Sequence, residues 1–161
     1  GLTVDDAPEA VMLQFLLEGI RDLLHPQAQR ANVTLELHLP AELPPVYARP
    51  SELRQILMNL LLNALQQMEE MGRQGQLVVE VQNPPDPTAP LQLRVRDDGP
   101  GIHTSLQERI FEFGYTTRRG GAGLGLTIAR QTARALGGDL CVEESEMLWG
   151  TTFLLELPKG A

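Results

Sequence analysis

The sequence is poor in several residue types, and each shortage excludes a class of protein. Cys141 is the only cysteine, so the chain cannot form an internal disulfide, which fits a reducing compartment such as the cytoplasm. Lysine and arginine number 13 against 21 aspartates and glutamates, and the formal net charge is −8. Such a chain lacks the basic face that binds nucleic acid or an anionic membrane. No uninterrupted apolar run approaches the roughly 18 to 20 residues that span a bilayer, so we expect a soluble protein.

What remains is the composition of one folded domain. The 161 residues, 42% of them apolar, are enough to bury a core, and we expect a single domain over residues 1–161. Apolar residues at helical spacing predict helices over residues 8–30 and 51–71, the second with Ser51 as its N-cap. Residues 33–39 alternate strictly and predict a half-buried strand. Further strands are predicted over residues 77–83, 91–97, 139–145 and 151–157, a short helix over about 105–110, and a last helix from about residue 124.

The second predicted helix carries a polar face beside its apolar stripe. Gln55, Asn59 and Asn63 follow one another at single-turn spacing on that face. Asparagine is unfavourable inside a helix, so its placement calls for water or for a polar ligand. Two explanations stay open: ordinary solvent exposure, or side-chain oxygens that ligate Mg²⁺, a hard cation that prefers oxygen.

The stretch "RVRDDGPGI", residues 94–102, ends an alternating strand in Asp97 and passes directly into glycines. Glycines at a strand end let the backbone approach a ligand closely. An ionised Asp97 could accept a hydrogen bond from an exocyclic amine such as that of adenine. The same residues would also make an ordinary turn in any protein.

The stretch "FGYTTRRGGAGLGLTIAR", residues 113–130, is the richest in glycine. It does not match the dinucleotide fingerprint, whose third glycine would fall at Leu126, and the chain has no Walker loop. What remains is a glycine-rich segment that leads into a helix, whose free N–H groups attract phosphate. Arg118 and Arg119 precede that helix and could pair with phosphates. The alternative is a flexible surface loop.

Taken in order, these features resemble the catalytic ATP-binding domain of sensor histidine kinases, a member of the GHKL superfamily with the Bergerat fold. "LRQILMNLLLNAL" resembles its N box, "DDGPGI" its first glycine box, "IFEFGYTT" its F box and "GAGLGL" its second glycine box. The resemblance covers essentially the whole chain. It implies an α/β (α+β) two-layer sandwich, with a mixed sheet of about five strands covered on one face by about three helices.

The resemblance also implies a site. Asn63 would ligate Mg²⁺, Asn59 would contact phosphate or metal, Asp97 would read the adenine amino group, and Arg118 would stabilise the transferred phosphoryl group. Asn59, Asn63 and Arg118 are the implied catalytic residues. The implied ATP-binding set is Asn59, Asn63, Asp97, Gly99, Gly101, Ile102, Arg118, Gly121, Gly123, Leu124, Gly125, Leu126 and Thr151. The ATP lid would span about 113–122, with Phe111 and Phe113 anchoring it to the core.

By the same resemblance the chain binds Mg-ATP and presents the γ-phosphoryl group to a histidine on a separate dimerisation domain, in two-component signalling. We expect that domain to lie outside this chain, because His25, His38 and His103 do not lie in an acceptor context. The domain alone is therefore not expected to autophosphorylate. The implied partners are the dimerisation domain and a response regulator, without nucleic acid or direct membrane contact, and the isolated piece would be a monomer. The implied location is the cytoplasm, which includes the cytoplasmic part of a membrane-bound sensor.

Two departures keep other functions open. Gln66 and Gln67 stand where many members have a lysine and an aromatic residue, and a non-catalytic nucleotide-binding docking module is one alternative. A GHKL ATPase or serine kinase is the other. Gyrases and chaperones place a glutamate general base where this chain has Asn59, so self-contained ATP hydrolysis should be slow.

Overall fold

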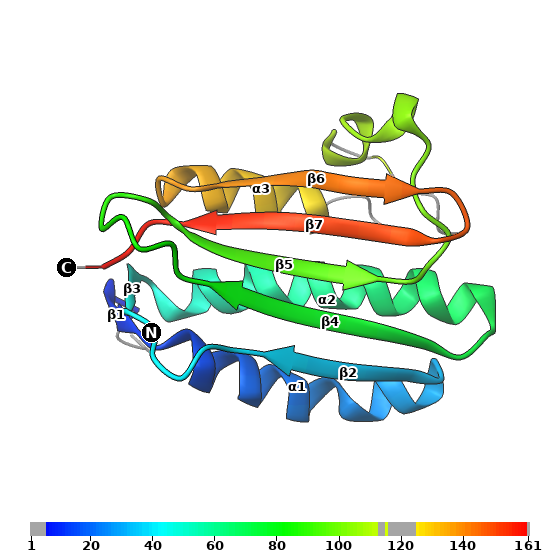
Figure 1. Cartoon of the computed structure of the whole chain (residues 1–161), viewed down its shortest axis with the longest axis horizontal. Coiled ribbons are helices and arrows are strands. Elements are labelled where there is room, and N and C mark those ends of the chain that lie inside the picture. Colours follow the sequence, from blue (N-terminus) through cyan, green and yellow to red (C-terminus); the bar gives the residue numbers. More distant parts are fainter. Residues whose placement is uncertain (1–5, 113–114, 116–124, 161) are drawn as a thin grey trace, which may run out of the picture.

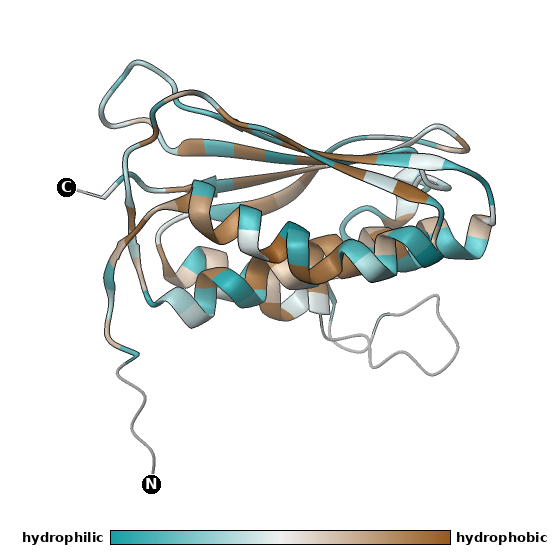
Figure 2. Cartoon of the chain, turned by 90° about the horizontal axis from the view of Figure 1, so that it is seen from below, coloured by the Kyte–Doolittle hydropathy of each residue, from teal (hydrophilic) through white to brown (hydrophobic). Residues whose placement is uncertain are grey.

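The computed structural model describes residues 6–112, 115 and 125–160. Their main feature is a mixed five-stranded sheet in the order β2-β4-β5-β7-β6, with β2 parallel to β4 and every other pair antiparallel. The strands are β2 (Val33–His38), β4 (Gly75–Gln82), β5 (Leu91–Asp97), β6 (Asp139–Glu146) and β7 (Gly150–Leu157). Helices lie on one face of the sheet, so the predicted two-layer sandwich is confirmed (Figures 1 and 2).

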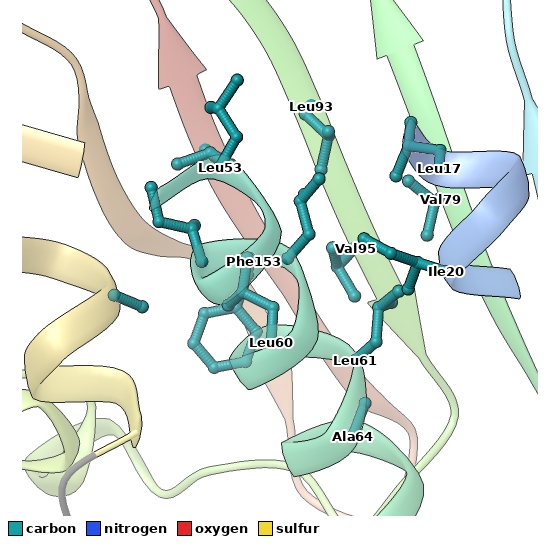
Figure 3. Close-up of a cluster of buried hydrophobic side chains, with 14 of the residues drawn as sticks. Leu17, Ile20, Leu53, Leu60, Leu61, Ala64, Val79, Leu93, Val95 and Phe153 are labelled. Atoms are coloured by element: carbon teal, nitrogen blue, oxygen red, sulfur yellow. The ribbon is translucent and has the colours of Figure 1, made fainter. Parts of the chain in front are cut away.

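The helical layer has α2 at its centre. α2 (Pro50–Met71) lies between α1 (Leu13–Arg30) and α3 (Gly125–Ala135), and it contacts both as well as the sheet. Eight residues of α2 are buried, from Leu53 to Met68. This apolar stripe is wide enough to pack against α1, α3 and the sheet. α3 instead turns the small residues Ala129 and Ala133 inward. Side chains from α1, α2 and the strands meet in one apolar cluster (Figure 3).

Several predicted boundaries are wrong, each for a local reason. The first helix starts at Leu13, because residues Glu9–Val11 form strand β1, which pairs with β3 (Val46–Ala48). Ser51 is not an N-cap: Arg49 holds that place, Pro50 occupies the first turn, and the Ser51 hydroxyl donates to Asp6 instead. The predicted short helix near 105–110 is two 3₁₀ turns, Thr104–Leu106 and Arg109–Phe111.

Within the described residues, no helix is long and apolar enough to cross a membrane. The three α-helices of this region are amphipathic and pack their apolar sides on the sheet.

Candidate functional site

Asp97 is a buried carboxylate at the end of a central strand. It alternates with buried Leu93 and Val95 on β5, so its side chain points to the helical side of the sheet and is 9% exposed. The backbone N–H groups of Gly99 and Thr151 donate to its Oδ1 at 2.9 and 3.3 Å. No described residue donates to Oδ2, which stays available as an acceptor for a ligand. Burial raises the pKa of Asp97 to about 6, although the two N–H donors oppose the rise.

The loop after Asp97 has little room for a Cβ at Gly99 and none at Gly101. A Cβ on Gly99 would lie 3.0 Å from Asp97 Oδ1 and 3.6 Å from Cγ of Met68 on α2. Gly101 has a φ of +77°, and a Cβ there would overlap the carbonyl of Glu146. These glycines therefore let the loop close around Asp97.

Ser145 on β6 joins this loop to β7. Its Oγ accepts the Ile102 N–H at 2.7 Å and lies 2.8 Å from the Thr151 hydroxyl. Ser145 thus holds together Ile102 and Thr151, two residues assigned to the site from the sequence. Sequence reasoning missed it because a β-bulge between Val142 and Glu144 shifts the register, so that Ser145 pairs with Thr151 on the helical side. Simple alternation from Val142 would put Ser145 on the open face.

The two asparagines of α2 are half-buried on the side of the helix that faces the start of α3. Asn59 Nδ2 donates to the Gly125 carbonyl at 3.1 Å, which orients the amide and leaves its Oδ1 for another partner. No described residue hydrogen-bonds the Asn63 side chain. Asn59 and Met68 are nine residues apart, about 14 Å along the helix. α2 therefore runs along the site, with Asn59 contacting the Gly125 end and Met68 lying next to the loop at the Asp97 end.

Phe111 of the F box is buried, and contacts from several elements hold it. Its ring meets Phe153 edge-on at 6.3 Å, and the Arg130 guanidinium lies 3.6 Å from the ring centroid. The Thr127 hydroxyl donates to the Phe111 carbonyl at 2.8 Å. Residues 111 and 127 flank the glycine-rich segment in the sequence, so this hydrogen bond brings its two ends together.

Other sequence predictions fall on residues that the structure does not describe. Arg118, Gly121, Gly123, Leu124 and Phe113 lie outside the described residues, as does the predicted lid 113–122 apart from Tyr115. Leu126 and Ile102 are partly buried against the core.

The described residues do not group three or more His, Cys, Asp or Glu side chains in a way that would hold a metal. A hard cation at this site would therefore rely on asparagine oxygens and on oxygens of the ligand. The Oδ1 of Asn59, to which no described residue donates, fits that donor set.

Comparison with known proteins agrees with this geometry. The chain is 38% identical over 163 residues to the sensor histidine kinase AruS of Pseudomonas aeruginosa, covering 94% of this chain and 16% of AruS. It superimposes on the catalytic domain of the histidine kinase ThkA with a TM-score of 0.80 at 26% identity, covering 94% and 95% of the two chains. ThkA has also been solved with the response regulator protein TrrA. A full-length structure of ShkA with AMPPNP matches at a TM-score of 0.84 and 28% identity, covering 100% of this chain and 33% of ShkA.

The curated relatives are much longer than this chain, which spans 20% of sporulation kinase E of Bacillus subtilis and 37% of an adaptive-response sensory kinase SasA. Residues 48–161 match the family described as histidine kinase-, DNA gyrase B-, and HSP90-like ATPase. The chain therefore belongs to this ATPase family, as a catalytic ATP-binding domain of the sensor histidine kinase type.

Proposed function

We propose that this domain binds Mg-ATP and presents its γ-phosphoryl group to a histidine on a separate dimerisation domain, as one step of two-component signalling in the cytoplasm. The observation that carries the proposal is Asp97, a buried carboxylate whose Oδ2 has no described donor. A buried acceptor of this kind suits the exocyclic amino group of adenine, which is a donor that guanine lacks at the same ring position.

The chain's own residues divide the binding between the end of β5, which would hold the base, and the middle of α2 with the start of α3, which would hold the phosphates. Asp97 accepts from the base, with Gly99, Gly101 and Ile102 shaping the loop around it and Thr151 donating to the same carboxylate. Asn59 and Asn63 would offer amide oxygens to the metal and amide N–H groups to phosphate oxygens, and the first turn of α3 offers backbone N–H groups from Gly125 and Leu126. Mg²⁺, when bound, neutralises charge on the β- and γ-phosphates.

Gly121, Gly123 and Leu124 would complete the phosphate cradle, and Arg118 would pair with the γ-phosphate from the lid. The nucleophile would come from outside this chain. His38 contacts Glu36, and His103 contacts Ser105 on an exposed turn, so both have local roles on the surface. The response regulator would then receive the phosphoryl group from that external histidine.

Titration calorimetry with AMPPNP, with and without Mg²⁺, tests nucleotide binding. We expect Mg²⁺-dependent binding by the intact chain, and loss of at least about tenfold in affinity for Asp97→Asn, because the amide loses charge and presents donors to the amino group. Glu80→Gln, a carboxylate on the open face of β4, is the matched control and should bind like the wild type. No binding at millimolar nucleotide would refute the proposal.

Phosphotransfer separates the remaining alternatives. With radiolabelled ATP, the chain alone should stay unlabelled, whereas a supplied cognate dimerisation domain should become labelled on histidine. Nucleotide binding without transfer would support the docking module, and turnover of ATP by the chain alone would support a GHKL ATPase. Asn59 and Asn63 carry amides, which cannot act as a general base for water as a carboxylate could. This favours the kinase over the ATPase.

A further inference from the structure

The turn between β6 and β7 exposes three large apolar side chains in succession. Met147, Leu148 and Trp149 are 51%, 69% and 74% exposed. They form what we call the apolar tip. Contiguous apolar surface is uncommon on a soluble domain and marks interaction sites.

The backbone of the apolar tip is held by two hydrogen bonds. The Leu148 N–H donates to the carbonyl of Pro100, in the loop that follows Asp97, at 2.8 Å. Within the turn itself, the Trp149 N–H donates to the Glu146 carbonyl at 3.0 Å. Leu148 has a φ of +72°, a conformation that a bulky non-glycine residue rarely adopts. The fold therefore holds an apolar residue outward in an unfavourable backbone conformation rather than turning it toward the core.

A groove of about 260 Å³ lies beside the apolar tip, on the face of the sheet that no helix covers. Its floor is a row of residues paired across four strands: Val78 pairs with Arg96, Arg96 with Thr152, and Thr152 with Glu144. Trp149 borders the groove as well. Asp97 and Thr151 also border the groove. The Asp97 side chain itself points to the opposite, helical side of the sheet, so the groove opens on the other face from the nucleotide site.

The charge of the groove selects its occupant. Asp98, Glu144 and Glu146 line it with Arg96 as the one cation among them. Among the described residues neither Glu144 nor Glu146 makes an ion pair, whereas neighbouring Glu143 is paired with Arg94. Two unpaired carboxylates beside an exposed indole suit a lysine or arginine side chain, which can contact both the carboxylates and the ring face.

We propose that the apolar tip and the groove together dock a basic segment of a partner protein, with an aliphatic side chain against the tip and a lysine or arginine in the groove. A second copy of this chain fits poorly, since each carries a net charge of −8. An anionic membrane is disfavoured by the same acidic groove. The inference does not depend on nucleotide binding.

Trp149 is the only tryptophan in the sequence, so its emission reports on the apolar tip directly. The probe is the peptide acetyl-Ala-Leu-Arg-Leu-Arg-Ala-amide, and the control peptide replaces both arginines with glutamate. We expect a blue shift and weaker acrylamide quenching with the basic peptide, an effect that decreases with salt, and no change with the acidic one. The absence of any blue shift would overturn the proposal.

Variants locate the binding by anisotropy of a labelled basic peptide. Trp149→Ala should weaken binding about tenfold, and the double variant Glu144→Gln, Glu146→Gln should weaken it about fivefold and flatten its salt dependence.

Phe15→Ala removes another exposed aromatic ring, 68% exposed on α1, and should bind like the wild type. Equal weakening by Phe15→Ala would overturn the proposal. So would a blue shift that grows with protein concentration without peptide, since that would indicate self-association. Circular dichroism melts of each variant identify unfolding.

Discussion

At the scale of single residues, Asp97 links stability to pH. Its pKa is raised from 3.8 to about 6 by burial, so the folded state holds the proton more tightly than the unfolded state. The stability contributed by that proton is complete below about pH 4 and is lost as the pH rises through about 6. At neutral pH the ionised carboxylate is therefore a cost to the fold.

Asp97→Asn should relieve that cost, because the amide oxygen can still accept the N–H groups of Gly99 and Thr151. We expect the free energy of unfolding of the variant to exceed that of the wild type by about 2 to 3 kcal/mol above pH 7. At pH 4 the two values should be nearly equal. Urea unfolding over this pH range measures the difference. A gain that did not change with pH would show that charge burial is not its cause.

The same group predicts how nucleotide affinity depends on pH. Protonation of Asp97 places a hydrogen on the carboxyl that should accept from adenine. Calorimetry should therefore show AMPPNP affinity decreasing below about pH 6, and Asp97→Asn should show a weaker affinity without that decrease. An unchanged affinity between pH 7.5 and 5 would count against Asp97 as the base reader.

Ser145 makes contacts beyond its own strand that bear on the site. Ser145→Ala removes the acceptor of the Ile102 N–H and the partner of the Thr151 hydroxyl. We expect a loss of about 1 to 3 kcal/mol in unfolding free energy, together with weaker AMPPNP binding. Ser105 is the matched control, since among the described residues its hydroxyl contacts only His103 on an exposed turn, and Ser105→Ala should change neither measurement. Equal effects of the two substitutions would contradict the positioning role of Ser145.

At the scale of elements, the loop after β5 and the β6–β7 turn depend on each other. Gly101 and Gly72 have similar backbone conformations, with φ of +77° and +70°. Only Gly101 lacks space for a Cβ, since nothing lies within 4 Å of one at Gly72. Alanine variants at these two glycines therefore separate the cost of a left-handed backbone from the cost of crowding at the Cβ.

Gly72→Ala should cost about 1 kcal/mol, the usual penalty for a left-handed alanine. Gly101→Ala should cost at least about 2 kcal/mol more, because the Glu146 carbonyl has to move and the Asp97 loop with it. Chemical denaturation gives both values, and Trp149 fluorescence reports movement of the turn. Similar costs for the two variants would mean that the loop accommodates a Cβ without moving the turn.

At the scale of the whole molecule, α2 connects the core to the site. Leu60 is 1% exposed and belongs to the cluster between the helices and the sheet (Figure 3). Leu60→Ala should lower the free energy of unfolding by about 2 to 5 kcal/mol, whereas the volume-conserving Leu60→Met should cost less than about 1.5 kcal/mol. Thermal and urea unfolding measure both. A loss under about 1 kcal/mol for the alanine variant would show that the layers close over the cavity.

Much of this arrangement follows from local patterns in the sequence. Helical spacing predicts the apolar stripe of α2, and alternation predicts the strand that ends in Asp97. Both depend on residues within a few positions of one another, and the structure confirms both. The Ser51 cap was wrong because Asp6, 45 residues away, binds its hydroxyl.

The tertiary structure decided what depends on distant residues. The bulge in β6 turns Ser145 toward Thr151 and Ile102, and the bond from Asn59 to Gly125 spans 66 residues. The groove beside Trp149 requires four strands in register, three of which pair with strands that are not their neighbours in the chain. The sequence alone determined which side chains could serve a nucleotide site. Packing determined which of them meet, because periodicity fixes the face on which a residue lies but not what lies opposite it.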